Sequence, residues 1–297
     1  MQFDSYCSRC QVLRQFEIGR RLLSTEDAHR YLLDVMDLIA HAPEGVSATY
    51  FTPLFQDALA KYGVTEDIYA EEKRWSNDLV LPLLPGLWQK VESSADPLLT
   101  AMKLAQMGNF LDFGVLRAED VHENVQDVLA RAETESLNEA EYRCFVEDLT
   151  KSKRLLIIGD NAGEIALDTL LVRQILRQFP HLHVTYGVRG SNALNDATRE
   201  DAAYVGMDKL VPIVDNGSRI SATELPYLGE EMRKELSASD MILTKGQANF
   251  ESMATCGLNV YYNFLCKCER FARILGVELL TGVFLNERRL PPINIYP

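Results

Sequence analysis

The sequence predicts an α/β protein, with an all-α helical-bundle domain at the N-terminus. A three-layer α/β/α domain with a Rossmann-like, mainly parallel sheet follows it. Residues 1–150 carry apolar side chains at helical spacing and contain no convincing strand. From residue 154 onward, short β-type runs alternate with helical stretches, which is typical of βαβ units covered on both faces. The lysine-rich junction Lys151-Ser152-Lys153 places the domain boundary, between residues 1–150 and 151–297.

The first half is expected to form a series of helices. The stretch 28–42 carries apolar side chains at helix-compatible spacing. Asp96-Pro97 is a strong helix start, because Asp accepts hydrogen bonds at the N-cap and proline is tolerated at the first helical position. Further helices are predicted over 48–62, 66–93, 96–112, 118–134 and 138–151.

The second half is expected to form the sheet. A continuous apolar run such as Leu155–Ile158 suits a strand that is buried on both faces. The short connections predict right-handed crossovers. Strands are predicted over 154–160, 183–190, 209–215, 241–245, 258–264 and 282–285. Helices are predicted over 163–179, 195–207, 223–238 and 267–276.

Composition and charge exclude several classes of partner. A hydrophobic content of 47% and a charged content of 25% are ordinary for a globular protein. The formal charge of −13 argues against nucleic acid and anionic membranes as partners, and an anionic ligand needs local cations or a metal. The first residues lack the features of a signal peptide and no apolar run could span a bilayer, so a cytoplasmic protein is expected. The sequence does not indicate an oligomeric state.

The cysteines leave two interpretations open. Six are present, as two close pairs and two single residues: Cys7 with Cys10, Cys266 with Cys268, Cys144 and Cys256. A cytosolic C-x-x-C pair is more typical of a metal or redox site than of a structural disulfide. The two pairs lack zinc-finger spacing, however, and buried cysteine often acts as a small hydrophobe. Reduced structural thiols are the first interpretation, and a metal or redox site joining the termini is the alternative.

Three polar clusters follow predicted strands, and the first is Asp160-Asn161-Ala162-Gly163-Glu164. Carboxylate and amide oxygens are hard ligands that suit Mg²⁺ or Mn²⁺. The free N–H groups of a following helix would face an anion. Simple helix capping is the alternative for Asp160 and Asn161. Because ligands bind at the carboxyl ends of strands in open α/β sheets, we expect this cluster to lie in the site.

The second cluster follows the strand that is predicted to end at residue 190. Asp196 could complete the metal's protein ligands, with helix capping as its alternative. Arg189 could hold a phosphate group with two parallel hydrogen bonds, with a surface or domain-interface ion pair as its alternative.

The third cluster is Lys245-Gly246-Gln247-Ala248-Asn249-Phe250-Glu251. Lys245 could reach a phosphate as a point charge, or lie on the surface. Asn249 could orient the substrate, and Glu251 could hold Lys245 or a water molecule. The cluster lacks the glycine pattern and the Lys-Ser/Thr dipeptide of a P-loop, and no dinucleotide fingerprint is present, so neither ATP nor NAD is expected by those routes.

Together, these clusters resemble the metal-dependent damage-control phosphatase family, a former domain of unknown function. The family is also called the protein-glutamate methyltransferase-like metal-binding domain. The resemblance extends from Cys7 to about Val283. The stretch from Gly108 to Gly114 looks like the helical-domain signature of that family, and Cys7, Cys10 and Cys268 look like the cysteines of its archaeal and bacterial subgroup. Cys266 departs from the pattern, since the family usually keeps one cysteine there.

The resemblance implies a site in the cleft between the helical domain and the α/β domain. Three residues would bind one divalent ion (Mg, Mn, Co or Ni): Asp160, Asn161 and Asp196. Lys245 would bind phosphate and complete the catalytic set. The remaining pocket residues would be Glu164, Arg189, Asn109 and Asn249.

The function predicted is metal-dependent hydrolysis of a small phosphomonoester, such as a sugar phosphate, a phosphopantetheine-like compound or a damaged phosphometabolite. Asp160 or Glu164 could act as general base, or Asp160 could form an aspartyl-phosphate intermediate. Two alternatives stay open: carboxyl methyl transfer from S-adenosylmethionine, and non-catalytic binding of a metal or metabolite. No glycine-rich adenosine loop follows the first predicted strand.

Overall fold

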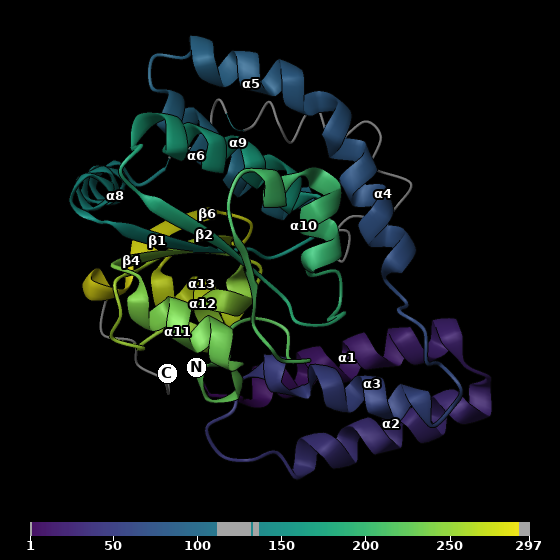
Figure 1. The fold of residues 1–297 in the computed structure, drawn as a ribbon. Helices are drawn as coiled ribbons and strands as arrows, with labels where there is room; N and C mark the ends of the chain where they lie inside the picture. The colour runs from purple at the N-terminus through teal and green to yellow at the C-terminus, as the bar shows by residue number, and fades with distance from the viewer. Residues whose placement is uncertain (1, 112–131, 133–136, 291–297) are drawn as a thin grey trace.

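The centre of the molecule is a six-stranded sheet, seen in a computed structural model that describes residues 2–111, 132 and 137–290 (Figure 1). The strands are β1 (Arg154–Ile158), β2 (His183–Val188), β3 (Ile213–Asp215), β4 (Met241–Lys245), β5 (Val260–Leu265) and β6 (Gly282–Asn286). Their order is β3-β2-β1-β4-β5-β6, and all neighbours pair in parallel except β5 and β6. The predicted mainly parallel α/β sheet is therefore confirmed.

Helices cover both faces of the sheet and give three layers (Figure 1). Alternate residues of β1 enter opposite cores: Leu155 and Ile157 face one, and Leu156 and Ile158 face the other. The first core is closed chiefly by α6 (Pro97–Met107) and α9 (Glu164–Gln178). The second is closed by α11 (Glu230–Ala238), α12 (Gln247–Met253) and α13 (Glu269–Leu275).

The helices of the first half pack in two different places. The first three pack around a core of their own, centred on Tyr31 and Phe51. Later helices join α9 on the first face of the sheet. The separate group is α1 (Ser5–Leu22), α2 (Thr25–Ala40) and α3 (Thr52–Ala60), with η1 (Ala48–Phe51). The group on the sheet is α4 (Ala70–Val80), α5 (Leu84–Ser93), α6 and α8 (Glu139–Lys151), with η2 (Leu81–Leu83). The division at residue 150 stays a prediction.

Several predicted elements are shorter than expected, for local reasons. The helix predicted over 66–93 is broken into three pieces, where Pro82 and Pro85 each remove a backbone donor. The helix predicted from 223 starts only at Glu230, after a loop that contains η5 (Leu225–Tyr227). The strand predicted over 209–215 is limited to β3, because η4 (Met207–Lys209) precedes it.

Other predictions of secondary structure agree with the fold. Asp96 caps α6, with its Oδ1 accepting from Leu99 N–H at 3.0 Å. α10 (Arg199–Val205) occupies the later part of the helix predicted over 195–207. The helix predicted over 118–134 falls almost wholly outside the described residues. Among the described residues, no helix has the length and apolar character needed to cross a bilayer.

Candidate active site

The predicted site lies at the carboxyl ends of β1 and β4, where the strand order reverses and ligands usually bind in open α/β sheets. Main-chain contacts join the loops that follow β1 and β2. Ala197 N–H donates to Asp160 O at 2.7 Å, and Asn161 pairs with Asp196 as an isolated antiparallel bridge. These contacts bring together two clusters that are far apart in the sequence.

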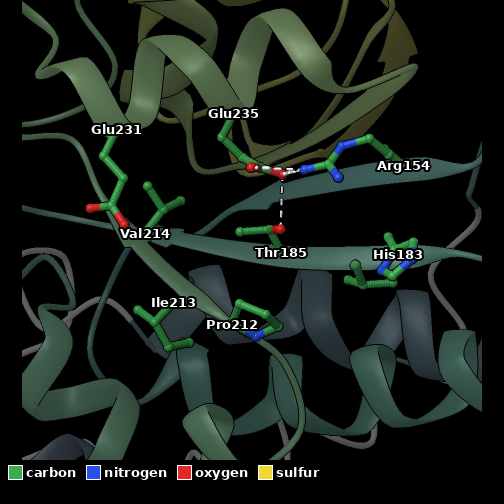
Figure 2. A pocket seen from close by; sticks show the side chains of 9 residues that line it. Arg154, His183, Thr185, Pro212, Ile213, Val214, Glu231 and Glu235 are labelled. Atoms are coloured by element: carbon green, nitrogen blue, oxygen red, sulfur yellow. Dashed lines mark hydrogen bonds and ion pairs between the residues drawn. The ribbon is translucent and has the colours of Figure 1, made fainter.

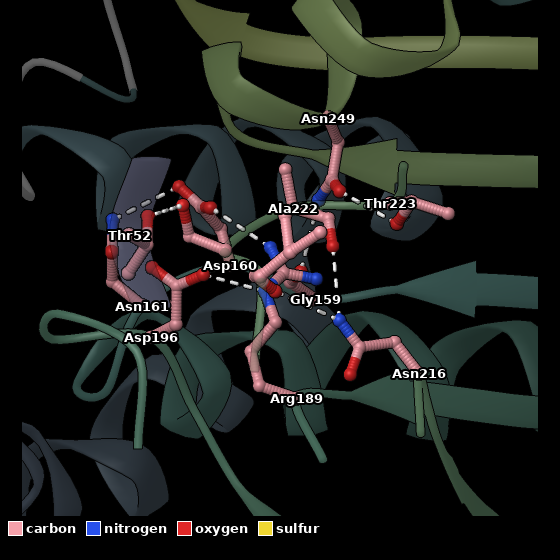
Figure 3. Close-up of polar contacts among 12 residues, drawn as sticks. Thr52, Gly159, Asp160, Asn161, Arg189, Asp196, Asn216, Ala222, Thr223 and Asn249 are labelled. Atoms are coloured by element: carbon pink, nitrogen blue, oxygen red, sulfur yellow. Dashed lines mark hydrogen bonds and ion pairs between the residues drawn. The ribbon is translucent and has the colours of Figure 1, made fainter. Parts of the chain in front are cut away.

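Asp160, Asn161 and Asp196 gather beside Arg189 (Figure 3). Arg189 Nε donates to Asp196 Oδ2 at 2.5 Å, and its Nη2 lies 3.5 Å from Asp160 Oδ1. Asn161 Nδ2 donates to Asp160 Oδ2 at 3.0 Å. Since one guanidinium contacts both carboxylates, the two acids face the same small space. All four side chains are buried, with at most 7% of each residue exposed.

Helix capping does not account for the two aspartates. Gly163 precedes α9 and provides no side-chain cap, so the helix after Asp160 starts without help from that carboxylate. The N-cap of α10 is Thr198, whose N–H donates to Asp201 Oδ2 at 2.9 Å. Arg189 is likewise no surface ion pair, because it is 1% exposed. The positions of Asp160 and Asp196 therefore favour a functional interpretation.

Asn109 connects the helical segment of the first half to the site. It lies in η3 (Gly108–Leu111), and its Nδ2 donates to Asp160 Oδ2 at 3.1 Å and to Glu164 Oε2 at 3.0 Å. Its Oδ1 accepts from Leu265 N–H at 3.2 Å. At Gly108, an added Cβ would stand 2.8 Å from Glu164 Cγ, so the close approach requires glycine. The rest of the predicted signature, residues 112–114, lies outside the described part of the chain.

Lys245 is buried completely and saturated with partners. Its Nζ donates to Glu164 Oε1 at 2.5 Å, to Asp168 Oδ1 at 2.7 Å and to Ala105 O at 2.9 Å. An ammonium group has three N–H donors, so these contacts use all of them. The surface interpretation of Lys245 is wrong. Its observed contacts make it the centre of a carboxylate cluster, and phosphate binding by Lys245 stays a prediction.

Asn249 and Glu251 act on neighbouring main chain. Asn249 Nδ2 donates to Gly159 O at 3.1 Å and to Lys245 O at 2.7 Å, which ties α12 to the ends of β1 and β4. Its Oδ1 accepts from Thr223 Oγ1 at 2.8 Å (Figure 3). Glu251 Oε1 instead accepts from Ala48 N–H at 3.0 Å, at the base of the first three helices. The acids that hold Lys245 are thus Glu164 and Asp168, and a substrate contact of Asn249 stays a prediction.

Burial and crowding of like charges shift several pKa values. Burial raises the pKa of Asp160 well above its usual range, and the neighbouring acids Asp196 and Glu164 add to the shift. Burial also raises the pKa of Asp168 to about 6, although Lys245 offsets part of the effect. Burial disfavours the charge of Lys245, but Asp168 and Glu164 outweigh it and raise the pKa of the lysine. The raised pKa favours the protonated form of Asp160, so a cation that binds beside it would displace a proton.

The donor set fits a divalent cation. Asp160 and Asp196 supply carboxylate oxygens, and Asn161 supplies an amide oxygen after a half-turn that exchanges Nδ2 and Oδ1. Within the described part of the chain, no three Asp, Glu, His or Cys side chains form a metal-binding group. The set thus depends on the amide oxygen as its third protein donor.

Some residues of the site were not assigned a role from the sequence. Asp168 completes the Lys245 cluster and accepts from Tyr186 Oη at 2.6 Å. Gln247 ties the end of β5 to the start of α12, since its Oε1 accepts from Lys267 N–H at 2.7 Å. Only their positions could have indicated a role. Tyr186 lies on β2, next to β1, and Asp168 and Gln247 lie on helices that start beside the site.

The cysteines are free thiols, and Cys7 lies where the first residues of the described chain contact α13. Cys7 Sγ lies 3.8 Å from Arg270 Nη1, and Arg270 Nε pairs with Asp4 at 2.9 Å. Burial raises the pKa of Cys7 to about 12, which leaves it a protonated thiol at neutral pH. These observations agree with reduced structural thiols, while a redox role stays open.

A hollow lies away from the predicted site (Figure 2). It has a volume of about 260 Å³ and is lined near the starts of β1 and β2 by Arg154 and His183. Glu235 also lines it. Its Oε1 accepts from Arg154 Nη2 at 2.8 Å and from Thr185 Oγ1 at 2.9 Å. None of the predicted site residues lines this hollow.

The chain is similar to known proteins over nearly its whole length. The family model described as the damage-control phosphatase ARMT1-like domain matches residues 7–282. A damage-control phosphatase of Archaeoglobus fulgidus is 32% identical over 286 residues, which cover 94% of this chain and 97% of that relative. A damage-control phosphatase of Pyrococcus horikoshii is 28% identical over 74% of each chain. The crystal structure of a DUF89 family protein from Pyrococcus horikoshii has the same fold, with a TM-score of 0.80 at 24% identity over 97% of this chain and 99% of that one. The chain therefore belongs to the ARMT1-like damage-control phosphatase family.

Proposed function

We propose that this protein is a metal-dependent phosphatase that hydrolyses a small phosphomonoester between the first three helices and the sheet. Relatives named damage-control phosphatases support a phosphatase activity. The observation that carries the proposal is an unbalanced buried cluster at one edge of the sheet. Four carboxylates face two cations there: Asp160, Glu164, Asp168 and Asp196 against Arg189 and Lys245.

With all four acids ionised, the cluster has an excess of two negative charges, which matches the charge of one divalent cation. Uncompensated buried charge is strongly unfavourable, so the cluster favours binding of such an ion. We propose Asp160, Asn161 and Asp196 as its ligands, and Mg²⁺, Mn²⁺, Co²⁺ or Ni²⁺ as the ion. When bound, a divalent ion polarises a phosphoryl oxygen and makes a coordinated water a better nucleophile.

Arg189, Lys245 and Glu164 would then position the phosphate group and the attacking water. Arg189 Nη1 is buried and has no hydrogen-bond partner among the described residues, so one donor is open to a phosphate oxygen. Lys245 holds Glu164 and Asp168 in place and keeps a positive charge near the reacting group. Glu164 Oε2 accepts only from Asn109 among the contacts described, and this supports Glu164 as the proposed general base.

Phosphatase assays with p-nitrophenyl phosphate test this proposal, in the presence of Mn²⁺, Co²⁺, Ni²⁺ or Mg²⁺ and after chelation. Asp160→Asn and Asp196→Asn should each lower kcat/KM about 100-fold or more, because even partners of metal ligands matter by about 10- to 100-fold. Asp208→Asn, at an exposed aspartate, is the matched control and should keep wild-type activity. Undiminished metal-dependent turnover in both site variants would refute the proposal.

The same preparations separate the alternatives. Calorimetric binding of S-adenosylmethionine, without phosphatase turnover, would indicate the methyl-transfer function. Thermal stabilisation by metal with no turnover of a broad phosphoester panel would indicate a binding protein. A panel of sugar phosphates and phosphopantetheine-like compounds then identifies the substrate class.

A further inference from the structure

The hairpin of α1 and α2 carries apolar side chains on its outer surface as well as in its core. Four of them have between 40% and 53% of their surface exposed: Leu13, Phe16, Leu33 and Met36. They are half of the large apolar side chains that are exposed in the described part of the chain. In Figure 1, the group of α1, α2 and α3 lies to one side of the sheet and its covering helices. Exposed apolar surface is therefore concentrated on this hairpin.

On each helix, the two exposed apolar residues are three positions apart and form one short stripe along the helix. Successive residues are turned by about 100° around a helix, so the stripes face away from the buried Ile18 of α1 and Val35 of α2. Ile18 and Val35 belong to the core that α3 closes. The two stripes thus lie on the outer face of the hairpin.

The contact between α1 and α2 brings the two stripes to the same height. An added Cβ on Gly19 would stand 3.1 Å from Tyr31 Cδ1 and 3.8 Å from Ala28 Cα, so the antiparallel helices are in register near these residues. Three residues back along α1 and three forward along α2, Phe16 is level with Leu33. A further three residues bring the other members of the stripes level. The four side chains therefore form one apolar patch.

The two helices carry opposite charges. α1 has four arginines and one glutamate, which give it a net charge of +3. α2 has four acidic residues and one arginine, which give it a net charge of −3 with its histidine neutral. The chain as a whole has a formal charge of −13, so a basic helix is an exception in it. A face that is basic along one side and acidic along the other is complementary to a rotated copy of itself.

Two such hairpins can stack face to face about a two-fold axis in two ways. An axis that runs across the helices places α1 on α1 of the other copy, which brings like charges together. An axis that runs along the helices places α1 on α2 of the other copy, and residues of equal height stay level. The second arrangement joins opposite charges, so electrostatics favours it. It also packs the stripe of α1 against the stripe of α2.

Individual charges match in this second arrangement. Three pairs of exposed residues of opposite sign come within about one helical turn of the same height: Arg9 with Asp37, Glu17 with Arg30, and Arg20 with Glu26. Glu26 also pairs with Arg30 of its own helix at 2.6 Å, so two of these pairs would join in one network. Charges of opposite sign thus flank the apolar patch, as at the edges of a helical bundle.

We infer that the outer face of the α1–α2 hairpin binds a second copy of this chain, forming a two-fold symmetric four-helix bundle in which α1 packs on α2 of the other copy. The inference is independent of the proposed catalytic function. Helices of 18 and 16 residues are about 25 Å long, and two side by side are about 20 Å wide, so each face covers about 500 Å². The total of about 1,000 Å² is at the lower end for specific interfaces, so a micromolar dissociation constant is expected.

Sedimentation velocity of the full chain, from about 1 to 200 µM, measures the association over a range that brackets such a constant. The wild type should shift with concentration from 33.6 kDa towards twice that mass. Leu33→Glu places a charge in the apolar patch and should weaken the dimer about 100-fold or more. Leu279→Glu makes the same change at a leucine that is 47% exposed, against 49% for Leu33, and lies outside the hairpin. This control should dimerise like the wild type, and thermal melting verifies that both variants are folded.

An exchange of charges tests the pairing of α1 with α2. One variant combines Arg9→Glu with Arg20→Glu and makes α1 acidic, and a second combines Glu26→Arg with Asp37→Arg and makes α2 basic. Each variant alone should stay monomeric where the wild type dimerises, because like charges then face each other. An equal mixture of the two should form dimers again, since every α1 then meets an α2 of opposite sign.

A wild type that stays monomeric at the highest concentration would overturn the inference, and the face would then be open to a different protein. A dimer that Leu33→Glu leaves intact would show that the copies associate through another surface. Charge variants that dimerise separately, or that fail to dimerise when mixed, would rule out the pairing of α1 with α2.

Discussion

Gly246 determines how closely the end of β4 approaches Asp160. Its φ of +79° lies in the left-handed region, and an added Cβ would overlap the Asp160 carboxylate. Side chains are disfavoured there for two separate reasons, backbone strain and contact. Gly257 has nearly the same φ, +76°, but no atom within 4 Å of an added Cβ. The pair offers a way to separate the two effects.

Gly257→Ala should lose about 1–2 kcal/mol of unfolding free energy, the usual cost of a side chain at positive φ. Gly246→Ala should lose more, because its Cβ also overlaps the Asp160 carboxylate. Only Gly246→Ala should also lose phosphatase activity and metal binding, because its methyl group displaces Asp160. Urea denaturation and Mn²⁺ calorimetry provide the measurements. Equal activity in the two variants would show that the position of Asp160 is not critical.

At the scale of residues, sequence order alone predicted which acids and amides converge. Asp160, Asn161 and Asp196 could be predicted because each follows a strand at the carboxyl edge of a parallel sheet. It could not be predicted that all three N–H donors of Lys245 are used within the protein. Its partner Asp168 lies on the second turn of α9 and faces inward only once the helix packs on the sheet. The tie between Lys267 and Gln247 likewise requires that β4 and β5 be adjacent.

Among the elements, the first half of the loop between β3 and α11 is fixed by the side chain of Asn216. Asn216 Nδ2 donates to Ile220 O at 3.1 Å and to Ala222 O at 3.0 Å, and its Oδ1 accepts from Gly190 N–H at 2.8 Å. Ala222 adopts a φ of +65°, and the next residue, Thr223, donates through Oγ1 to Asn249 Oδ1 at 2.8 Å (Figure 3). The clamp therefore holds a strained segment against the site.

Asn216→Ala should cost about 2–3 kcal/mol of stability, because it leaves several buried backbone groups without partners. It should also raise KM, since the segment around Ala222 loses its support. Asn138→Ala, which removes only the cap of α8, is the control. It should cost about 1 kcal/mol and leave KM unchanged. Kinetics on both variants, with urea denaturation, measure the difference, and a wild-type KM in Asn216→Ala would contradict a role in the site.

The helical and strand elements were predicted well where periodicity was strong. The strands β1, β4 and β6 appear within two residues of their predicted ends, because buried apolar runs bounded by polar loops leave little choice. The segment before α11 was predicted as helix and is a loop, since tertiary contacts of Asn216 outweigh weak helical periodicity. Glycines at 217 and 229 also approach each other closely there, with an added Cβ on Gly217 only 2.6 Å from Gly229 Cα.

At the scale of the whole molecule, polar contacts attach the first three helices to the rest. Glu224 accepts from Ser47 Oγ and, at 2.9 Å, from Thr49 Oγ1. Thr52 Oγ1 lies 2.8 Å from Ser221 Oγ. These helices have a core of their own, so their packing does not depend on the apolar cores of the sheet. Their attachment is therefore separable from their folding.

Glu224→Ala should loosen this attachment by about 1–3 kcal/mol, the usual cost of unpairing buried polar groups. Amide hydrogen exchange should then accelerate in the segment 45–53, while exchange in β1 and β4 stays at the wild-type rate. Glu231→Ala, which removes only an exposed pair with Arg199, is the control and should leave the exchange pattern unchanged. Acceleration throughout the sheet would show instead that the helices and the sheet unfold as one unit.

The ion pair between Asp4 and Arg270 has a consequence for biosynthesis. Arg273 adds a second contact between the same two segments, with Nη1 2.6 Å from Tyr6 Oη. During translation, α1 is synthesised before α13, which carries both arginines. The surface that α1 contacts is therefore incomplete until α13 has been made. The docking of α1 on this segment is thus a late event in synthesis. In nascent chains truncated before residue 270, the first three helices should pack on their own core without these two contacts.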